Sequence, residues 1–432
     1  MTWLQRYRAR QFIRNSMWVF PVLSMAAALA IVRLLDWVGG VMGWEADLHP
    51  DTARAVLATM AASLFTFVVF VSSALLIALQ LASAQLTPRV IGLVVGEPVT
   101  KWSLSLFVFA FTFSLGALVR VAPSVPLLTT HAVAYGAVLS LAVFLYLIDH
   151  VCRVLRPSGA MRWVARLGRK VIEQVYPRQL SGPGPTLPAA AGDGGGEVVR
   201  TVPSPRDGVV QAFDVEGLVA LARRAACVIE LVPQVGDSVA VGDPLFRTLG
   251  GGADLPANDL CRSVAVGQER TLEQDPVFAF RILVDIASKG LSPGINDPTT
   301  AVLAIDQIHH LLSNVGGRRL DDERVCDASG VMRLLYRTPD WEDFVHLAVT
   351  EIRHFGGGSI QVARRLRAML EDLIRKLPAC RAPLLQQELS LLHRSATRSF
   401  SEPEDVALAE VCDFQGVGGK DENGQAAARG SV

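Results

Sequence analysis

Four long apolar runs near the start of this 432-residue chain limit its possible folds more than any other feature. Each run has the length that a helix needs to cross roughly 30 Å of hydrocarbon. The runs cover residues 17–35, 55–88, 102–119 and 121–148, and the last three contain no charged side chain. The sequence therefore predicts a four-helix transmembrane domain over residues 17–152, preceded by a basic segment at residues 1–16.

Basic residues flank the predicted spans unevenly. They precede the first span, lie between the second and third, and follow the fourth: Arg6, Arg8, Arg10, Arg14, Arg89, Lys101, Arg153, Arg156, Arg162, Arg166, Arg169 and Lys170. The loop after the first span carries Glu45, Asp47 and Asp51 instead. Because positively charged loops stay in the cytoplasm, we expect both termini there. Arg33 and Asp36, three residues apart, are expected to pair with each other, which makes them weak evidence for a charged pathway.

The second span carries polar side chains at intervals of seven residues: Thr59, Thr66, Ser73, Gln80 and Thr87. Seven residues nearly complete two helical turns, so these side chains share one face. The 34 charge-free residues would extend about 51 Å as a helix, which is longer than the hydrocarbon is thick. Either this helix is strongly tilted, or its end from Gln80 to Thr87 projects into the cytoplasm. The polar face can be a helix–helix contact, a water-accessible line around a pore, or a groove for lipid or substrate. The first two interpretations keep this face away from lipid.

After the spans, the sequence changes character several times. Residues 153–179 are basic and amphipathic, which is compatible with a helix on the inner leaflet or with a simple solvated helix. Residues 180–196 form a linker rich in proline and glycine. A small β-rich domain is expected at residues 197–268, a helical domain at 269–413 and a disordered tail at 414–432. The predicted fold class is thus a membrane α-helical bundle with a cytosolic α+β region.

The β-rich segment resembles the small β-barrel of biotinyl and lipoyl carrier domains, through the run "GVVQAF…IELVPQVGDSVAVGDPLF". Those carriers attach their cofactor to a lysine on a hairpin turn. No lysine lies between Lys170 and Lys289, so this resemblance implies a shared fold at most, with no attached cofactor.

Two helices in the C-terminal region begin with the same signal, an aspartate followed by proline: Asp275–Pro276 and Asp297–Pro298. Aspartate caps a helix N-terminus and proline suits its first position. The link between these helices contains Ser292, Gly294, Asn296 and Asp297. These residues can form a structural turn, or they can converge on a ligand.

The sequence contains no motif that indicates catalysis. HExxH and the P-loop are absent, no GxSxG elbow surrounds Ser292, and the six cysteines lack metal-binding spacing. His309 and His310 belong to no local metal motif either. Because the formal net charge is zero, nucleic acid is not an expected partner. We expect no enzyme activity, no cofactor and no resident metal.

Near the inner end of the fourth span, Asp149 and His150 are candidates for interfacial hydrogen bonding. The same pair can instead form part of a proton or cation path, because ionisable residues within membrane spans often mark such paths.

Three segments carry a resemblance to a known family: "SSALLIALQLASAQLTPRVI", "SKGLSPGINDPTTA" and "FGGGSIQVARRL". With them the chain resembles an uncharacterised family of bacterial predicted membrane proteins, domain of unknown function family 2254. The resemblance implies a multi-pass protein of the bacterial plasma (inner) membrane with four N-terminal spans. It implies no activity and no catalytic residues.

Two functional hypotheses follow from these features. The first is a channel-like or transport homo-oligomer, in which the polar face of the second span surrounds a path for a small ion or solute. The second is a membrane-anchored cytosolic interaction or sensing module without transport activity.

Overall fold

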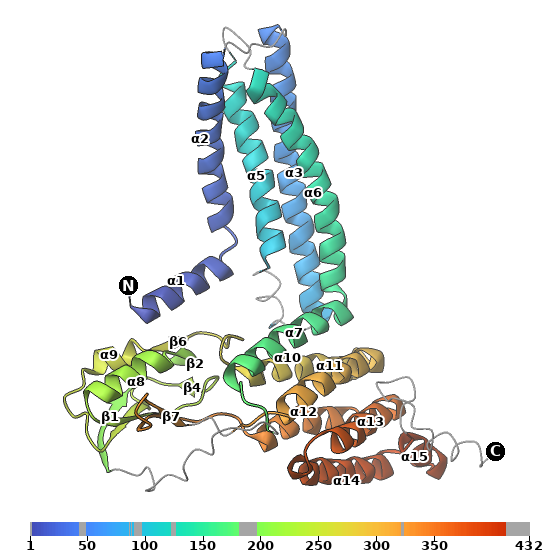
Figure 1. Ribbon diagram of the computed structural model, residues 1–432. Coiled ribbons are helices and arrows are strands. Elements are labelled where there is room, and N and C mark those ends of the chain that lie inside the picture. The colour runs from blue at the N-terminus through green and yellow to red at the C-terminus, as the bar shows by residue number, and fades with distance from the viewer. Residues whose placement is uncertain are drawn as a thin grey trace. The chain divides into compact units, whose positions relative to one another are not determined.

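The computed structural model describes residues 2–42, 49–85, 87, 89, 97–121, 127–180, 197–320 and 324–411 (Figure 1). The chain divides into two compact units, which we call the N-terminal bundle (Ala9–Ala160) and the C-terminal unit (Met1–Arg8 with Met161–Val432). The predicted linker beyond Leu180, the predicted tail at 414–432, and Glu45 with Asp47 lie outside the described residues.

The N-terminal bundle contains four described helices that are long and apolar enough to cross a membrane, which confirms the predicted spans. They are α2 (Val19–Met42), α3 (Pro50–Gln85), α5 (Pro98–Leu118) and α6 (Leu127–Leu155). Half of the most apolar stretch of α5 is buried, against 11–17% in the other three helices. The third span therefore forms the centre of the bundle, packed against α2, α3 and α6 (Figure 1).

Large apolar side chains cover the outside of this bundle. Leu23 on α2, Ile77 on α3 and Leu145 on α6 are each more than 60% exposed. A soluble protein would bury such side chains, whereas lipid can cover them in a membrane. This exposed apolar surface agrees with the lengths of the four helices.

The C-terminal unit begins with the first turns of α1 (Trp3–Asn15), where Leu4 and Tyr7 pack on Ala212 and Ala265. It contains two sheets. The five-stranded sheet has the order β1-β5-β3-β8-β7, and the three-stranded sheet has the order β4-β2-β6. The strands are β1 (Val198–Pro203), β2 (Gly208–Phe213), β3 (Val228–Leu231), β4 (Ser238–Val239), β5 (Pro244–Leu249), β6 (Val264–Gly267), β7 (Arg324–Cys326) and β8 (Met332–Tyr336).

Both sheets are open, so the predicted closed β-barrel is corrected by the structure. Two features prevent closure. Strands β1 and β2, which follow each other in the chain, belong to different sheets. The hairpin of β7 and β8, from a region expected to be helical, adds to β3 through a parallel pairing and extends the sheet outward. The core between these strands includes Leu218 of α8 (Val215–Arg224), and a short helix, α9 (Ala257–Cys261), follows β5.

The helices of the C-terminal unit start where their capping signals predict. Asp275 accepts a hydrogen bond from the Phe278 amide at the start of α10 (Pro276–Gly290). Asp297 accepts one from the Thr300 amide at the start of α11 (Pro298–Gly316). The remaining helices are α7 (Pro157–Val175), α12 (Trp341–Phe355), α13 (Ile360–Lys376), η1 (Ala379–Arg381), α14 (Ala382–Ser399) and α15 (Pro403–Ala409).

Candidate functional site

The polar residues of the second span lie on the outside of the N-terminal bundle. Thr59, Thr66, Ser73 and Gln80 are all exposed on α3, whereas Thr87 lies beyond the end of that helix and is buried. The side chains of α3 that pack against the rest of the chain are Ala53, Leu57, Ala61, Leu64 and Val71. At about 100° per residue, the polar face lies about 170° from this packing face. The four exposed polar residues therefore take no part in packing among the described residues.

Three of the four exposed polar side chains bond to their own helix. The hydroxyls of Thr59, Thr66 and Ser73 donate to the carbonyls four residues earlier, at 2.8, 3.1 and 2.9 Å. Such hydroxyls need no further donor partner in an apolar medium. Gln80 is different, because its amide carries two donors and one acceptor and no other described residue hydrogen-bonds with it. Gln80 is thus the side chain on this face that most requires a partner.

The interior of the bundle is polar along α5, a feature that sequence reasoning missed. The buried hydroxyl residues there are Thr100, Ser103, Ser105, Thr112 and Ser114. Lys101 is only 3% exposed, and its ammonium donates to the carbonyl oxygens of Ile13 (3.2 Å) and Arg14. Those carbonyls belong to the last turn of α1, so Lys101 caps that helix. From sequence, Lys101 contributed only a positive charge to the predicted topology.

One end of the bundle is held by Asp36. Its carboxylate accepts from Arg120 at 2.7 Å and from the Thr129 hydroxyl at 2.8 Å. The expected Arg33–Asp36 pair is therefore replaced by contacts from other parts of the bundle. Arg54 of α3 donates to the carbonyl of Val121 at 3.0 and 2.8 Å. These bonds join α2, α3 and α6 to the end of α5.

The other end contains an acid–imidazole pair. The Nε2 atom of His150 lies 3.0 Å from a carboxylate oxygen of Glu97, and the two side chains are only 17% and 13% exposed. The preceding residue, Asp149, points outward and pairs with Arg153 at 2.7 Å. Asp149 and His150 therefore do not form one site. The nearly buried pair is Glu97 with His150, which no local sequence pattern indicated.

Several polar groups in the turn between α10 and α11 form hydrogen bonds within the turn and with the adjacent helix ends. The Ser292 hydroxyl donates to the Lys289 carbonyl at 2.7 Å, and the Asp297 carboxylate accepts from the Thr300 amide and hydroxyl at 3.1 and 2.6 Å. The hydrogen bond from the Thr300 hydroxyl lowers the pKa of Asp297. Asn296 adopts a positive φ of 48°, and no atom lies close to a Cβ placed on Gly294. These contacts favour the structural-turn interpretation, with Gly294 and Asn296 exposed.

A chain of buried charged groups joins α11 to α13. Arg365, 1% exposed, donates to Asp306 at 2.5 Å and approaches His309 Nδ1 at 3.2 Å. The Nε2 atom of His309 lies 3.0 Å from Asp372, which also binds Lys376 at 2.8 Å. Burial and the adjacent Arg365 charge lower the pKa of His309 to about 4. His309 is therefore neutral at pH 7, with Nε2–H facing Asp372 and Nδ1 accepting from Arg365.

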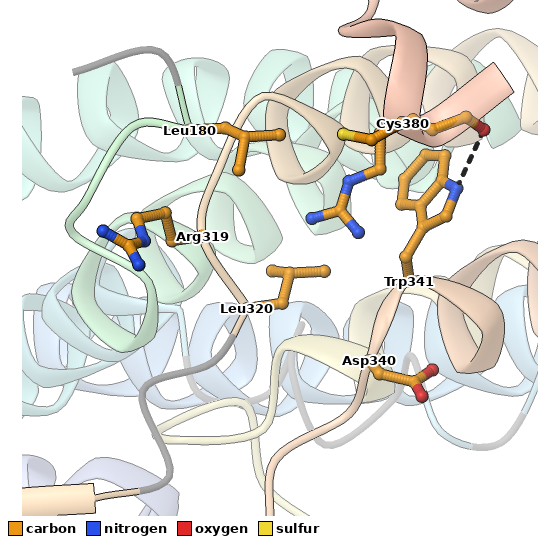
Figure 2. A pocket seen from close by; sticks show the side chains of 7 residues that line it. Leu180, Arg319, Leu320, Asp340, Trp341 and Cys380 are labelled. Carbon is orange, nitrogen blue, oxygen red and sulfur yellow. Dashed lines mark hydrogen bonds between the residues drawn. The ribbon is translucent and has the colours of Figure 1, made fainter. Parts of the chain in front are cut away.

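An open pocket of about 410 Å³ lies at the end of α11 (Figure 2). Its lining residues are Leu180, Arg319, Leu320, Asp340, Trp341, Cys380 and Arg381. The Trp341 indole donates to the Arg381 carbonyl at 3.3 Å, and the Arg381 guanidinium lies over the Trp341 ring and donates to the Arg318 carbonyl at 3.0 Å. Since these polar groups already bond within the protein, we assign this pocket no ligand. Among the described residues, no group of three metal-ligating side chains could hold a metal ion.

A family model described as Predicted membrane protein (DUF2254) matches residues 14–372. The chain belongs to this family. The matched region includes all four candidate spans, both sheets and the buried charged groups of α11 and α13 up to Asp372.

Two mycobacterial relatives of this DUF2254 chain are uncharacterised proteins, Rv1290c of Mycobacterium tuberculosis and Mb1321c of Mycobacterium bovis. Each is 28% identical over 92% of this chain and 79% of the relative. No solved structure is significantly similar to the chain. The likeness supports a membrane protein of unknown function and names no activity.

Proposed function

We propose that this protein is a channel-like homo-oligomer of the bacterial plasma membrane, with both termini in the cytoplasm. In this assembly the polar face of α3 surrounds a path for a small ion or solute. The observation that carries the proposal is the outward direction of Gln80, opposite the packing face of its own helix.

An exposed glutamine on a membrane-spanning helix is costly if lipid covers it. Its amide groups lose their hydrogen bonds to water, which costs several kcal/mol without a compensating partner. No described part of this chain covers Gln80. Further copies of the chain can shield the Gln80 amide from lipid. Rotational symmetry brings the same face of α3 from each copy towards a common axis.

The chemistry of this face suits conduction better than tight binding. Thr59, Thr66, Ser73 and Gln80 are polar and uncharged. Oxygen atoms of this kind can replace part of the hydration shell of an ion without holding it strongly. The hydroxyl oxygens keep a free lone pair even while they donate to their own helix. Each of these polar side chains can therefore bind water in such a path.

The three hydroxyls bonded to their own helix also favour a second candidate function, a membrane-anchored interaction or sensing module. Since those hydroxyls tolerate lipid, only Gln80 would then need protein or headgroup contact. In that case the C-terminal unit, with its own sheets and core, would carry the activity.

Conductance of the purified full-length protein in a planar bilayer tests the first proposal. We expect discrete currents in the wild type and their loss in Gln80→Leu and Ser73→Leu. The adjacent Ser72 supplies a matched control, because it is also exposed but lies about 100° from Ser73 around the helix. Ser72→Leu should conduct like the wild type. Unchanged currents in Gln80→Leu and Ser73→Leu, or no current in the wild type over a range of voltages and ions, would contradict the proposal.

A further inference from the structure

Helix α7 presents a compact basic face. Arg162, Arg166, Arg169 and Lys170 are all exposed. At about 100° per residue, these four side chains fall within an arc of about 100°. None of them forms a hydrogen bond or an ion pair with another described residue. Glu173, an acidic residue on the same face, lies 3.8 Å from Arg318. It forms no ion pair with the four basic side chains.

The opposite face of α7 is occupied by the protein itself. Met161, Val164 and Ile172 are fully buried. At Gly168 the helix lies so close to α10 and α11 that a Cβ would be 2.5 Å from Ala279 and 3.4 Å from Leu311. This packing distinguishes α7 from an amphipathic helix that inserts its apolar face into lipid. The basic face is the surface that α7 leaves for a partner.

Hydrogen bonds also hold the C-terminal end of α7 against the C-terminal unit. Arg318, 7% exposed, donates to the carbonyl of Tyr176 at 2.7 Å. The Tyr176 hydroxyl donates to the Pro339 carbonyl at 3.0 Å. These bonds limit rotation of α7 about its own axis. Packing within the C-terminal unit therefore fixes the side of that unit on which the basic face lies.

The chain connection brings this face only a few residues after the fourth candidate span. The fourth candidate span ends at Val154, and α7 begins at Pro157. The turn between them is tight, because a Cβ on Gly159 would lie 2.0 Å from the Arg153 carbonyl oxygen. Arg162 therefore follows the span by only eight residues, so the chain itself limits how far this face can lie from the bilayer surface.

We propose that the basic face of α7 binds the headgroups of anionic phospholipids. Four unpaired positive charges that closely follow a candidate membrane span in the chain complement a negatively charged bilayer surface, and such residues each add to binding near that surface. Trp163, half-buried beside the basic face, suits the same interfacial zone. This inference does not depend on conduction by α3.

The test uses the full-length protein reconstituted into phosphatidylcholine vesicles that contain a spin-labelled lipid. The measured quantity is the fraction of probe immobilised by the protein, compared for phosphatidylglycerol and phosphatidylcholine probes. We expect the wild type to prefer phosphatidylglycerol. The variant R162Q/R166Q/R169Q/K170Q should lower that preference by about threefold or more, because four charges near the surface are removed.

Two control variants separate this face from total charge. R223Q/R224Q/R394Q/R398Q removes four exposed charges from α8 and α14 and should keep the wild-type preference. R162K/R166K/R169K keeps the charge of the face and should also keep the preference. Equal preference in the wild type and the α7 variant, or an equal loss in the α8/α14 variant, would overturn the proposal. So would retention of a labelled polyribonucleotide that depends on this face without any lipid preference.

Discussion

In the N-terminal bundle, several buried and exposed hydroxyls bond to carbonyls of their own helix, whereas in the C-terminal unit buried charged groups pair between helices. Ser105 and Ser114 inside the bundle donate to carbonyls four residues earlier, as Ser73 does outside it. In the C-terminal unit, Arg353 pairs with Glu388 from α12 to α14, and His309 faces Asp372 from α11 to α13.

This difference determines how firmly each unit fixes its own packing. A hydroxyl bonded within its helix requires no particular neighbour, so helices of the bundle can face lipid, their own chain or another copy. A buried charge without its partner is strongly destabilising, so a buried pair disfavours arrangements that separate its two helices. In the bundle, ion pairs such as Asp36–Arg120 and Glu97–His150 lie towards the ends of the spans.

The largest effect should come from breaking the Arg353–Glu388 pair. The two side chains are 8% and 2% exposed, with 3.3 Å between their charged atoms. Glu388→Ala leaves a buried guanidinium without its carboxylate, and we expect a loss of about 3–5 kcal/mol of stability. Amide hydrogen exchange of α12 and α14 in the solubilised full-length protein measures this loss as a lower free energy of opening.

A double variant tests whether the cost arises from the unpaired charge. Arg353→Met with Glu388→Leu replaces both charges by apolar side chains of similar size, and it should recover most of the lost stability. If the double variant were as unstable as Glu388→Ala, packing rather than pairing would explain the effect, and the comparison between the two units would weaken.

Lowering the pH should reduce the stability of the protein by a smaller amount, through protonation of His309. Its pKa in the folded state is about 4, below the ordinary value of 6.5, because of burial and the charge of Arg365. Protons therefore bind the unfolded state more readily between these values. Stability should be complete above about pH 6.5 and should fall towards pH 4, by up to about 3 kcal/mol from this group.

The variant His309→Gln isolates the histidine from other acid-sensitive groups. Glutamine can donate to Asp372 and accept from Arg365, but it does not titrate. The thermal unfolding midpoint of the variant should fall less steeply than that of the wild type between pH 6.5 and 4. Parallel curves would show that His309 does not contribute to the acid sensitivity.

A leucine introduced on the inner and outer polar faces of the bundle should have unequal effects. Ser114 on α5 is 1% exposed, so Ser114→Leu must displace neighbouring helices at a cost of about 1–3 kcal/mol. Ser73→Leu on the exposed face should change stability by about 0.5 kcal/mol or less. Thermal unfolding in detergent, with the monodisperse fraction from gel filtration, compares the two. Equal destabilisation would show that the α3 face is also packed.

Local sequence signals predicted much of the C-terminal helices and all four spans. Asp275 and Asp297 could be identified as caps because a cap and its proline lie within a few residues. The β7–β8 hairpin was missed, although Asp327 and Gly330 mark its turn, because its neighbour β3 lies far away in the sequence. Closure of a sheet depends on such distant pairings, and the β-barrel prediction was wrong for that reason.

The candidate site was only partly accessible from sequence. Periodicity grouped Thr59, Thr66, Ser73 and Gln80 on one face, but periodicity gives no direction relative to the other helices. The direction depends on which face of α3 packs against α5. The buried side chains of Leu57 and Leu64 identify that face. His309 with Asp372 was not predictable either, because the two residues meet only through the packing of α11 on α13.

The smallest effect on stability, and the sharpest test of the exposed α3 face, should come from single cysteines. In a background with Cys152, Cys380 and Cys412 replaced by serine, Ser73→Cys and Ser72→Cys each add one exposed thiol to the same helix. A symmetric assembly around the polar face brings copies of residue 73 together and directs residue 72 away. A short bifunctional thiol reagent added to membranes should therefore link Ser73→Cys into dimers or larger species and leave Ser72→Cys mostly monomeric.

Equal linking at both positions would indicate random collisions. Linking at residue 72 alone would place a different face of α3 at the interface, and the path for ions would then have to be sought elsewhere, first along the buried polar side of α5.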